Sequence, residues 1–168
     1  MATLYLHEFK TRLGVIHSAS TDKALLLLTL PDTTADRFHE MISDRFPKYE
    51  ILLGGKINAI VEKEVKAFCT GRLKKFSIPL TINGTPFQSS ILKHVARIPW
   101  GKIESYGEVA AKSGFPRAAR AVGTVMSSNL LPLVVPCHRV VASNGIGGYG
   151  GGLEMKKILL GMEGVQFD

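Results

Sequence analysis

A change of periodicity at residues 83–86 limits this chain to a two-part fold. Before it, apolar residues occur in the short runs typical of strands, and three runs predict an antiparallel meander: residues 3–7, 14–19 and 24–30. After it, apolar residues recur at the three- and four-residue spacing of helices. The Asn-Gly-Thr-Pro turn between the two parts favours a domain boundary. We expect an α/β (α+β) protein with an N-terminal α/β domain at 1–82 and a mostly helical C-terminal domain at 85–168.

Helix signals assign the remaining elements. In the first part, the patterns predict two helices and one more short strand, at residues 33–46, 57–68 and 78–82. In the second part they predict four helices, at residues 87–98, 105–113, 116–127 and 153–162. Ser105 and Glu108 have the spacing of a capping box, and Pro116 suits the first position of a helix. The two middle helices, joined by a short turn that contains a glycine, predict a helix-turn-helix.

Positive charge is concentrated in the second part. The chain has a net charge of +7, and the segment 93–139 carries seven Lys or Arg against two Glu, a net +5. Such a basic stripe is the usual footprint of a nucleic-acid-binding protein, although an ordinary solvated face explains the charge alone equally well. The helix predicted at 116–127 has Arg117 and Arg120 among alanines and a glycine. The small residues have no polar side chain that could hydrogen-bond a base edge. If it binds DNA, we expect phosphate contacts with weak sequence preference.

The composition indicates an intracellular protein. The longest early apolar run, 24–30, is too short to cross a bilayer and predicts a buried strand, so we expect no membrane partner. Charged residues interrupt the first twelve positions, and we expect no signal peptide. Two cysteines provide no disulfide framework, which favours a reducing compartment. We expect a cytoplasmic, nucleoid-associated protein, or a nuclear one in a eukaryotic cell.

Cys137, in the segment PCHR, admits two interpretations. It follows the apolar run 130–135, and a free cysteine in such a place is commonly a small buried hydrophobe. Its neighbours favour reactivity, because Pro136 can begin a helical turn while His138 and Arg139 supply a base and a positive charge. Adjacent side chains point in different directions, so a water would have to bridge the thiol and the imidazole. A carboxylate from elsewhere would orient the histidine, and Glu163 is a candidate.

The glycine-rich stretch after Cys137 indicates a loop that makes room for a flat ligand. Residues 145–150 match the pattern G-x-G-x-x-G, and a predicted helix follows them. The dinucleotide-binding fold also needs a complete βαβ unit and an acidic residue about twenty positions later. The sequence after this stretch is too short for that unit. We therefore expect no nucleotide cofactor.

Several motifs, in this order, resemble those of the O6-alkylguanine-DNA alkyltransferases. They are Ser105-Tyr106-Gly107, the string ARAVG at 119–123, Ser128-Asn129, the string PCHRV at 136–140, and Tyr149 followed by Gly-Gly-Gly-Leu. The resemblance covers about residues 85–164, whereas the first 80 residues match only in general plan, which implies a ribonuclease-H-like domain there. It implies DNA repair by direct reversal in double-stranded DNA. The alkyl group of O6-alkylguanine, and less so of O4-alkylthymine, passes irreversibly and once to Cys137.

The resemblance also implies a methylated-DNA–[protein]-cysteine S-methyltransferase in which individual residues have defined roles. Cys137 is the nucleophile, which His138 and Glu163 activate through a water. Asn129 ties the active-site segment to the helices. Tyr106 donates a proton to the departing guanine and crowds the rotating phosphate.

Further residues would bind the DNA and the flipped base. Arg120 fills the gap that the flipped nucleotide leaves, and the other expected DNA contacts are Tyr106, Gly107, Ala119, Arg117, Ser143 and Gln88. The guanine pocket would be formed by Val140, Tyr149, Gly150, Gly151 and Gly152. Family members often have a serine where Gly150 stands, so a backbone N–H would have to bind O6 here. The implied state is a monomer, with cooperative binding along DNA left open.

Some members of the family bind a structural zinc ion in the first domain. Cys69 and the histidines of this domain, His7, His17 and His39, do not show the required spacing. We therefore expect no metal and no other cofactor.

Two alternatives from other functional classes remain open. A cysteine–histidine hydrolase uses the same pair of side chains, turns over esters or peptides, and needs no DNA. A non-enzymatic helix-turn-helix protein would recognise alkylguanine, recruit other repair factors and lack a reactive cysteine. For three single residues a structural role also fits the sequence: Tyr106 in packing at a helix start, Arg120 as a surface charge, and Asn129 at a helix end.

Overall fold

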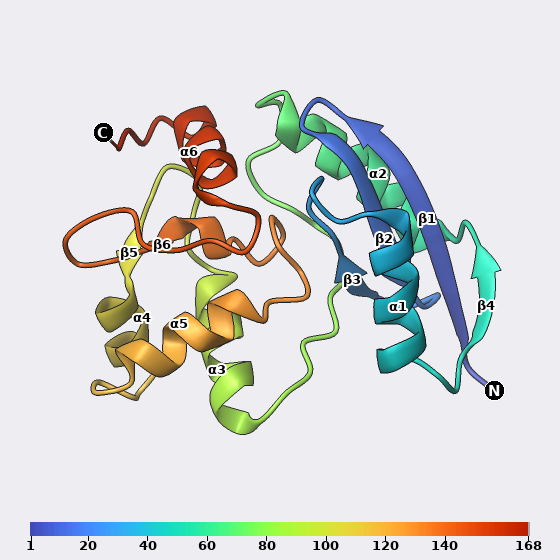
Figure 1. The fold of residues 1–168 in the computed structure, drawn as a ribbon, viewed down its shortest axis with the longest axis horizontal. Helices are drawn as coiled ribbons and strands as arrows, with labels where there is room; N and C mark the ends of the chain where they lie inside the picture. Colours follow the sequence, from blue (N-terminus) through green and yellow to red (C-terminus); the bar gives the residue numbers. More distant parts are fainter. Residues whose placement is uncertain (168) are drawn as a thin grey trace. The chain divides into compact units, whose positions relative to one another are not determined.

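The computed structural model describes residues 1–167 (Figure 1). These residues form two compact units, one of residues 1–81 and one that begins at residue 82. The division falls one residue before Asn83-Gly84-Thr85-Pro86, the predicted turn. Residue 168, the last of the predicted second domain, lies outside the described residues.

A four-stranded sheet organises the first unit (Figure 1). The predicted antiparallel meander is confirmed, since β1 (Thr3–Thr11) pairs with β2 (Gly14–Ser20), which pairs with β3 (Leu25–Leu28). A fourth strand, β4 (Glu50–Leu53), lies parallel to β1 at the edge and gives the order β3-β2-β1-β4. The sequence did not predict β4 because it has four residues, all exposed, and so shows no alternation of buried and exposed positions.

Two helices complete the first unit, close to the predicted positions. Helix α1 (Ala35–Arg45) begins after Thr34, whose hydroxyl accepts a hydrogen bond from the Arg37 amide, and α2 (Lys56–Cys69) packs against β1, β2 and β3. The strand predicted at 78–82 is wrong. Only Leu80 forms a bridge, with Leu25, because Pro79 has no N–H to continue a ladder.

The second unit is mostly helical and follows the sequence signals with two exceptions. Helix α3 (Pro86–Val95) starts with a Thr85–Gln88 capping box and ends three residues earlier than predicted. Helix α4 (Tyr106–Lys112) starts with the predicted Ser105–Glu108 capping box. Helix α5 (Ala119–Ser127) begins three residues later than predicted, because Pro116 and Arg117 form a turn in which the Ala118 amide donates to the Phe115 carbonyl.

The segment that contains Cys137 lies between these helices and the last one (Figure 1). A single-turn 3-10 helix, η1 (Cys137–Arg139), leads into β6 (Val140–Val141), which pairs in parallel with β5 (Glu104–Ser105). Helix α6 (Leu153–Met162) has the predicted bounds. Every residue from 131 to 141 is buried, so this segment passes through the core of the unit. Within residues 1–167, no helix is long and apolar enough to cross a membrane.

Candidate active site around Cys137

Cys137 is the first residue of η1, directly after Pro136, as the helical-turn prediction requires. Its side chain is buried, with the residue 6% exposed, and the polar side chains of Asn129 and Tyr149 lower the pKa of its thiol. Burial raises the pKa of the Cys137 thiol and outweighs the lowering effects of Asn129, of the Lys156 charge and of Tyr149. The resting group is therefore a neutral thiol, and a base must remove its proton before it can react as a nucleophile.

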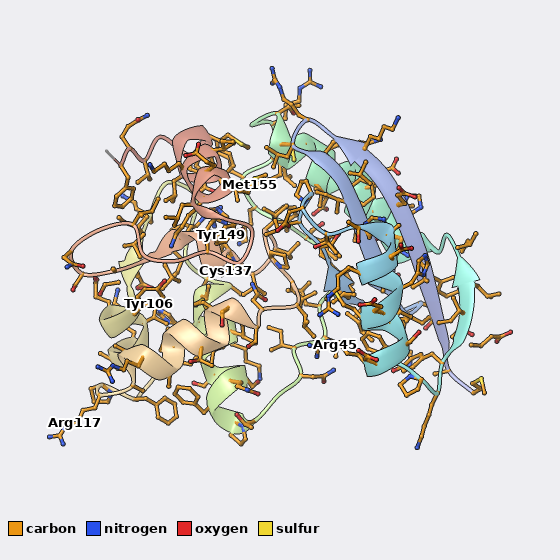
Figure 2. All side chains as sticks on the ribbon, in the orientation of Figure 1. Arg45, Tyr106, Arg117, Cys137, Tyr149 and Met155 are labelled. Carbon is orange, nitrogen blue, oxygen red and sulfur yellow. The ribbon has the colours of Figure 1, made fainter. Side chains whose placement is uncertain are left out.

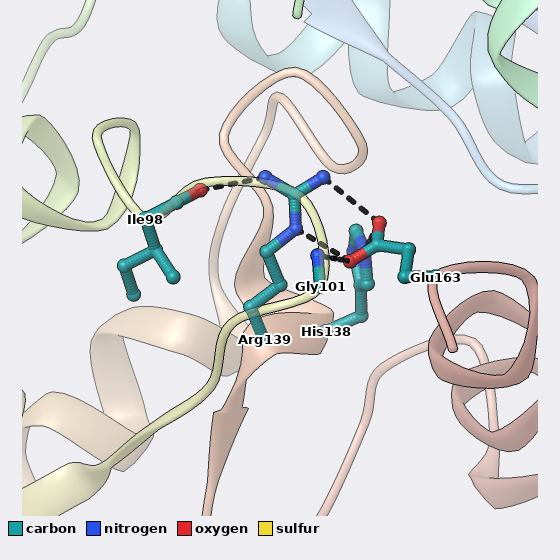
Figure 3. A network of polar contacts seen from close by, with 5 residues as sticks. All are labelled: Ile98, Gly101, His138, Arg139 and Glu163. Carbon is teal, nitrogen blue, oxygen red and sulfur yellow. Dashed lines mark hydrogen bonds and ion pairs between the residues drawn. The ribbon is translucent and has the colours of Figure 1, made fainter. Parts of the chain in front are cut away.

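The two residues that follow Cys137, His138 and Arg139, belong to a buried network of charged groups (Figure 3). His138 Nε2 lies 2.8 Å from Glu163 Oε2, and both side chains are completely buried. Arg139 donates to the same carboxylate through Nε and Nη2, each at 2.8 Å, and through Nη1 to the Ile98 carbonyl at 2.6 Å. The Gly101 amide also donates to Glu163, at 3.4 Å. One carboxylate from the end of α6 therefore holds two consecutive side chains of η1.

The electrostatics of this network determine which nitrogen of His138 is basic. Burial lowers the pKa of His138 and outweighs the raising effect of Glu163, so the imidazole is neutral at neutral pH. Burial by itself raises the pKa of Glu163, but hydrogen bonds from His138 and Arg139 outweigh it and lower that pKa to about 2. Glu163 is thus a carboxylate, and a neutral His138 must donate its Nε2–H to it. The lone pair is then on Nδ1, which is the basic nitrogen of the site.

Asn129 connects α5 to the cysteine segment. Its Nδ2 donates to the Val135 carbonyl at 2.9 Å, and its Oδ1 accepts from the Leu131 amide at 3.0 Å. The same side chain lowers the pKa of the Cys137 thiol. The tying role expected for Asn129 is consistent with these contacts, which a residue that only ended the helix would not make.

A cavity of about 200 Å³ opens beside the sulfur. Its walls come from α4, α5, η1 and the glycine-rich loop, and its lining residues are Tyr106, Gly123, Met126, Ser127, Cys137, Gly148, Tyr149 and Gly150; three of them are labelled in Figure 2. The Gly148 amide donates to the Tyr106 hydroxyl at 3.3 Å, which holds the loop against α4. A pocket with a nucleophile in its wall and aromatic side chains around it suits a flat heteroaromatic ligand.

Three of the residues expected in the guanine pocket do not line this cavity. Val140 is completely buried in β6, and its carbonyl accepts a hydrogen bond from Lys156. Gly152 precedes α6 at a φ of +91°, and Gly151 is also absent from the lining. Tyr149 and Gly150 do line it, together with Tyr106, which the resemblance assigned both to proton donation to the guanine and to DNA contact.

The residues expected to contact DNA fall into two groups. Four of them lie exposed on or near α4, α5 and the loop after β6: Gly107, Arg117, Arg120 and Ser143. Ala119 is half-buried at the start of α5. Gln88 is different, because its side chain accepts a hydrogen bond from the Thr85 amide and closes the α3 capping box. That contact is a structural role that the sequence analysis did not foresee.

Sequence reasoning missed one buried residue of the site, Lys156 on α6. It is completely buried, and its ammonium donates to carbonyls of the segment that follows Cys137. A signal was present, because Lys156 has the helical spacing of the apolar face formed with Leu159 and Leu160. A lysine on that face predicts a buried cation with a specific partner. Among residues 1–167, no group of three or more His, Cys, Asp or Glu is arranged to hold a metal ion.

Gly147→Ala is expected to destabilise the pocket loop. Gly147 has a φ of +76°, and an added Cβ would lie 2.8 Å from the Tyr106 hydroxyl and 3.0 Å from the Ala142 amide nitrogen. The left-handed backbone alone costs a non-glycine residue about 1–2 kcal/mol. Urea unfolding should show that the free energy of unfolding falls by at least this amount. Because the loop forms one wall of the cavity at Cys137, the rate at which iodoacetamide modifies Cys137 should also change. Gly145→Ala, which meets nothing within 4 Å, is the matched control, and equal behaviour of the two variants would contradict the prediction.

Comparison with known proteins supports the interpretation of this site. Residues 86–165 match the family model of the 6-O-methylguanine DNA methyltransferase DNA-binding domain. The methylated-DNA–protein-cysteine methyltransferase of Saccharolobus islandicus (strain M.16.27) is 35% identical over 160 residues, 94% of each chain.

Solved structures agree along nearly the whole chain. Mycobacterium tuberculosis OGT in complex with DNA matches with a TM-score of 0.81 and 30% identity, over 95% of this chain and 92% of that chain. The O6-methylguanine-DNA methyltransferase of Pyrococcus kodakaraensis strain KOD1 matches with a TM-score of 0.73 and 30% identity, over 97% of this chain and 100% of that chain. The buried cysteine, its histidine–carboxylate pair and these matches lead to one conclusion: this chain belongs to the family of the methylated-DNA–protein-cysteine methyltransferases.

Proposed function

We propose that this protein repairs DNA by moving the alkyl group of O6-alkylguanine, and less so of O4-alkylthymine, irreversibly to its own Cys137. The observation that carries the proposal is a buried thiol in the wall of a cavity, next to an imidazole that a carboxylate holds in one tautomer. The family supplies the enzyme class, a methylated-DNA–protein-cysteine methyltransferase that acts by direct reversal. Among solved relatives, the Mycobacterium tuberculosis protein forms a complex with DNA.

The proposed reaction is a single displacement at the alkyl carbon. His138 Nδ1 takes the thiol proton through a water, while Glu163 holds Nε2–H and stabilises the imidazolium that forms. The sulfur then forms a bond to the alkyl carbon as the bond from that carbon to O6 breaks. The departing guanine takes a proton from Tyr106, whose hydroxyl lies at the same cavity. The product is a stable thioether, so each molecule reacts once.

DNA reaches this cavity only if the damaged nucleotide leaves the stack, because a methyl group inside a duplex is not accessible to the sulfur. Arg120 lies exposed near the start of α5, where it can fill the gap. The small residues of α5 and the positive charge of segment 93–139 favour phosphate contacts with weak sequence preference. We place the protein, as a monomer, on chromosomal DNA in the cytoplasm, or in the nucleus of a eukaryotic cell.

The two compact units correspond in this proposal to an N-terminal domain of 1–82 and a DNA-binding, alkyl-transfer domain of 85–168. The sheet order β3-β2-β1-β4, with β4 parallel to β1, supports a ribonuclease-H-like N-terminal domain. Every residue of the proposed reaction comes from the second unit.

Intact-protein mass spectrometry tests the proposed transfer. After mixing with an excess of duplex DNA that contains O6-methylguanine, we expect one added methyl group per molecule, mapped by peptide analysis to Cys137. Cys69, the other free and buried cysteine, is the internal control and should stay unmodified, and Cys137→Ser should gain no methyl group. Tight lesion binding without a mass change would indicate a recognition protein, and ester turnover without an adduct would indicate a hydrolase.

A further inference from the structure

Lys156 is a completely buried lysine whose three N–H donors are all used by the backbone. Its Nζ donates to the carbonyls of Val140 at 2.7 Å, Ile146 at 2.7 Å and Gly148 at 2.9 Å. Val140 follows η1 directly, and Gly148 lines the same cavity as Cys137. One ammonium group on α6 therefore joins both ends of the loop that forms the wall of the pocket.

No carboxylate compensates this buried charge. Within residues 1–167, no Asp or Glu oxygen lies at ion-pair distance from Lys156, and Glu163 on the same helix is already bonded to His138 and Arg139. Backbone carbonyls solvate an ammonium only in part, and a buried cation without a counter-ion is costly. Lys156 binds the carbonyl of Gly148, which lines the same cavity as Cys137. Among the described residues, Cys137 and His138 are the ionisable groups whose pKa its charge affects. His138 is neutral or positive, so only the Cys137 thiolate can supply a negative charge.

We infer that Lys156 is a positioning residue for alkyl transfer: it is the counter-ion of the Cys137 thiolate and, through the same Nζ, the clamp of the pocket loop 140–148. The inference rests on the proposed role of Cys137 as the alkyl acceptor. Lys156 keeps its protons throughout, since the thiol proton goes to His138. Its positive charge favours the ionised sulfur that attacks the alkyl carbon, and its three hydrogen bonds hold Gly148 at the cavity where the base must lie.

The electrostatics of the two groups agree with this pairing. Burial lowers the pKa of Lys156 to about 8, and the negative charge of an ionised Cys137 opposes that effect. Conversely, the charge of Lys156 lowers the pKa of the Cys137 thiol, against the larger effect of burial. Two groups that interact in this way titrate as a coupled pair, so removal of either one must change the other.

The pH dependence of thiol reactivity tests the counter-ion role. We compare Lys156→Gln, which keeps hydrogen-bond donors but loses the charge, with Lys157→Gln, whose residue is the exposed neighbour on α6. Reaction of Cys137 with iodoacetamide and with free O6-benzylguanine is followed against pH in proteins that unfold cooperatively in urea. Loss of a nearby opposite charge should raise the midpoint of the profile by about one pH unit and slow the reaction about tenfold at neutral pH. Lys157→Gln should match the wild type, and an unshifted midpoint in Lys156→Gln would overturn the inference.

A reciprocal measurement keeps the inference testable if Lys156→Gln does not fold. In Cys137→Ala, ¹⁵N NMR of the lysine ammonium groups should show a lower pKa for Lys156 than in the wild type, because the thiolate is absent. An unchanged pKa would exclude the pairing. The proposed function and the role of Lys156 can be rejected separately. Absence of a methyl adduct from lesion DNA would reject the proposed function even if the pairing is found, whereas an adduct with no coupling would reject only the role of Lys156.

Discussion

Glu163→Gln is expected to destabilise the second unit by about 3–5 kcal/mol, because it leaves the buried Arg139 guanidinium without a counter-ion. The same change removes the carboxylate that fixes the tautomer of His138, so alkyl transfer should slow by roughly a hundredfold or more. Urea unfolding measures the first effect and single-turnover reaction with lesion DNA the second. Glu154→Gln, an exposed position in the first turn of α6, is the matched control and should show neither effect.

A second substitution separates stability from chemistry in this experiment. Arg139→Met removes the buried cation that Glu163→Gln leaves unpaired, and replacing both members of a buried ion pair by neutral groups is often nearly neutral. The double variant should therefore regain much of the stability but remain slow, because His138 still lacks its carboxylate. If Glu163→Gln unfolds at the same urea concentration as Glu154→Gln, the network in Figure 3 does not stabilise the unit as described.

Acid is expected to remove the stabilising effect of Glu163 in a defined pH range. The pKa of this carboxyl is lowered from 4.5 to about 2 in the folded protein, so its contribution is complete above pH 4.5 and is lost as the pH falls towards 2. The fall from 4.5 to about 2 corresponds to about 3 kcal/mol of unfolding free energy. His138 lowers the stability at a higher pH than Glu163 does. Burial lowers its pKa in the folded protein, so below pH 6.5 the unfolded chain binds a proton that the folded protein does not, and the free energy of unfolding falls.

The difference between two unfolding curves isolates the carboxylate. Glutamine resembles a protonated Glu163, so the gap in unfolding free energy between wild type and Glu163→Gln should be constant from pH 6.5 to pH 8 and close towards pH 2. The constant part is read above pH 6.5 because Glu163 raises the pKa of His138, so the imidazole titrates differently in the two proteins at lower pH. A gap that keeps its full size at pH 3 would show that the pKa of Glu163 is not lowered by its partners.

Local signals predicted most of the fold because their physical cause is also local. The capping box of Ser105 and Glu108 closes within one helical turn, and α4 begins where it indicates. Pro116 shows the limit of such signals, because a proline suits both the first turn of a helix and the turn before it. Here Pro116 lies in the turn closed by the hydrogen bond from the Ala118 amide to the Phe115 carbonyl, and α5 begins only at Ala119.

The active site was predictable in part, and its missing pieces are long-range contacts. The local sequence indicates Cys137 as a candidate nucleophile beside a candidate base, but its burial and the bidentate Arg139–Glu163 pair depend on how α6 packs. The partner of His138 lies 25 residues away along the chain; local reasoning named Glu163 only as a candidate, and the resemblance to a family assigned the pair. The partners of Lys156 are harder still to predict from the sequence. They are backbone carbonyls, which every residue type has, so no residue type marks them.

The shared carboxylate has a consequence for the order of protein synthesis. Glu163 follows His138 by 25 residues, and both members of the activating pair are needed to fix the basic nitrogen. A chain still being translated therefore contains Cys137 before it contains the carboxylate that orients its base. Until residue 163 has been made and α6 has packed, Cys137 is not next to an oriented base, so the arrangement proposed for alkyl transfer does not yet exist. We therefore expect a chain that stops before residue 163 to lack alkyl transfer.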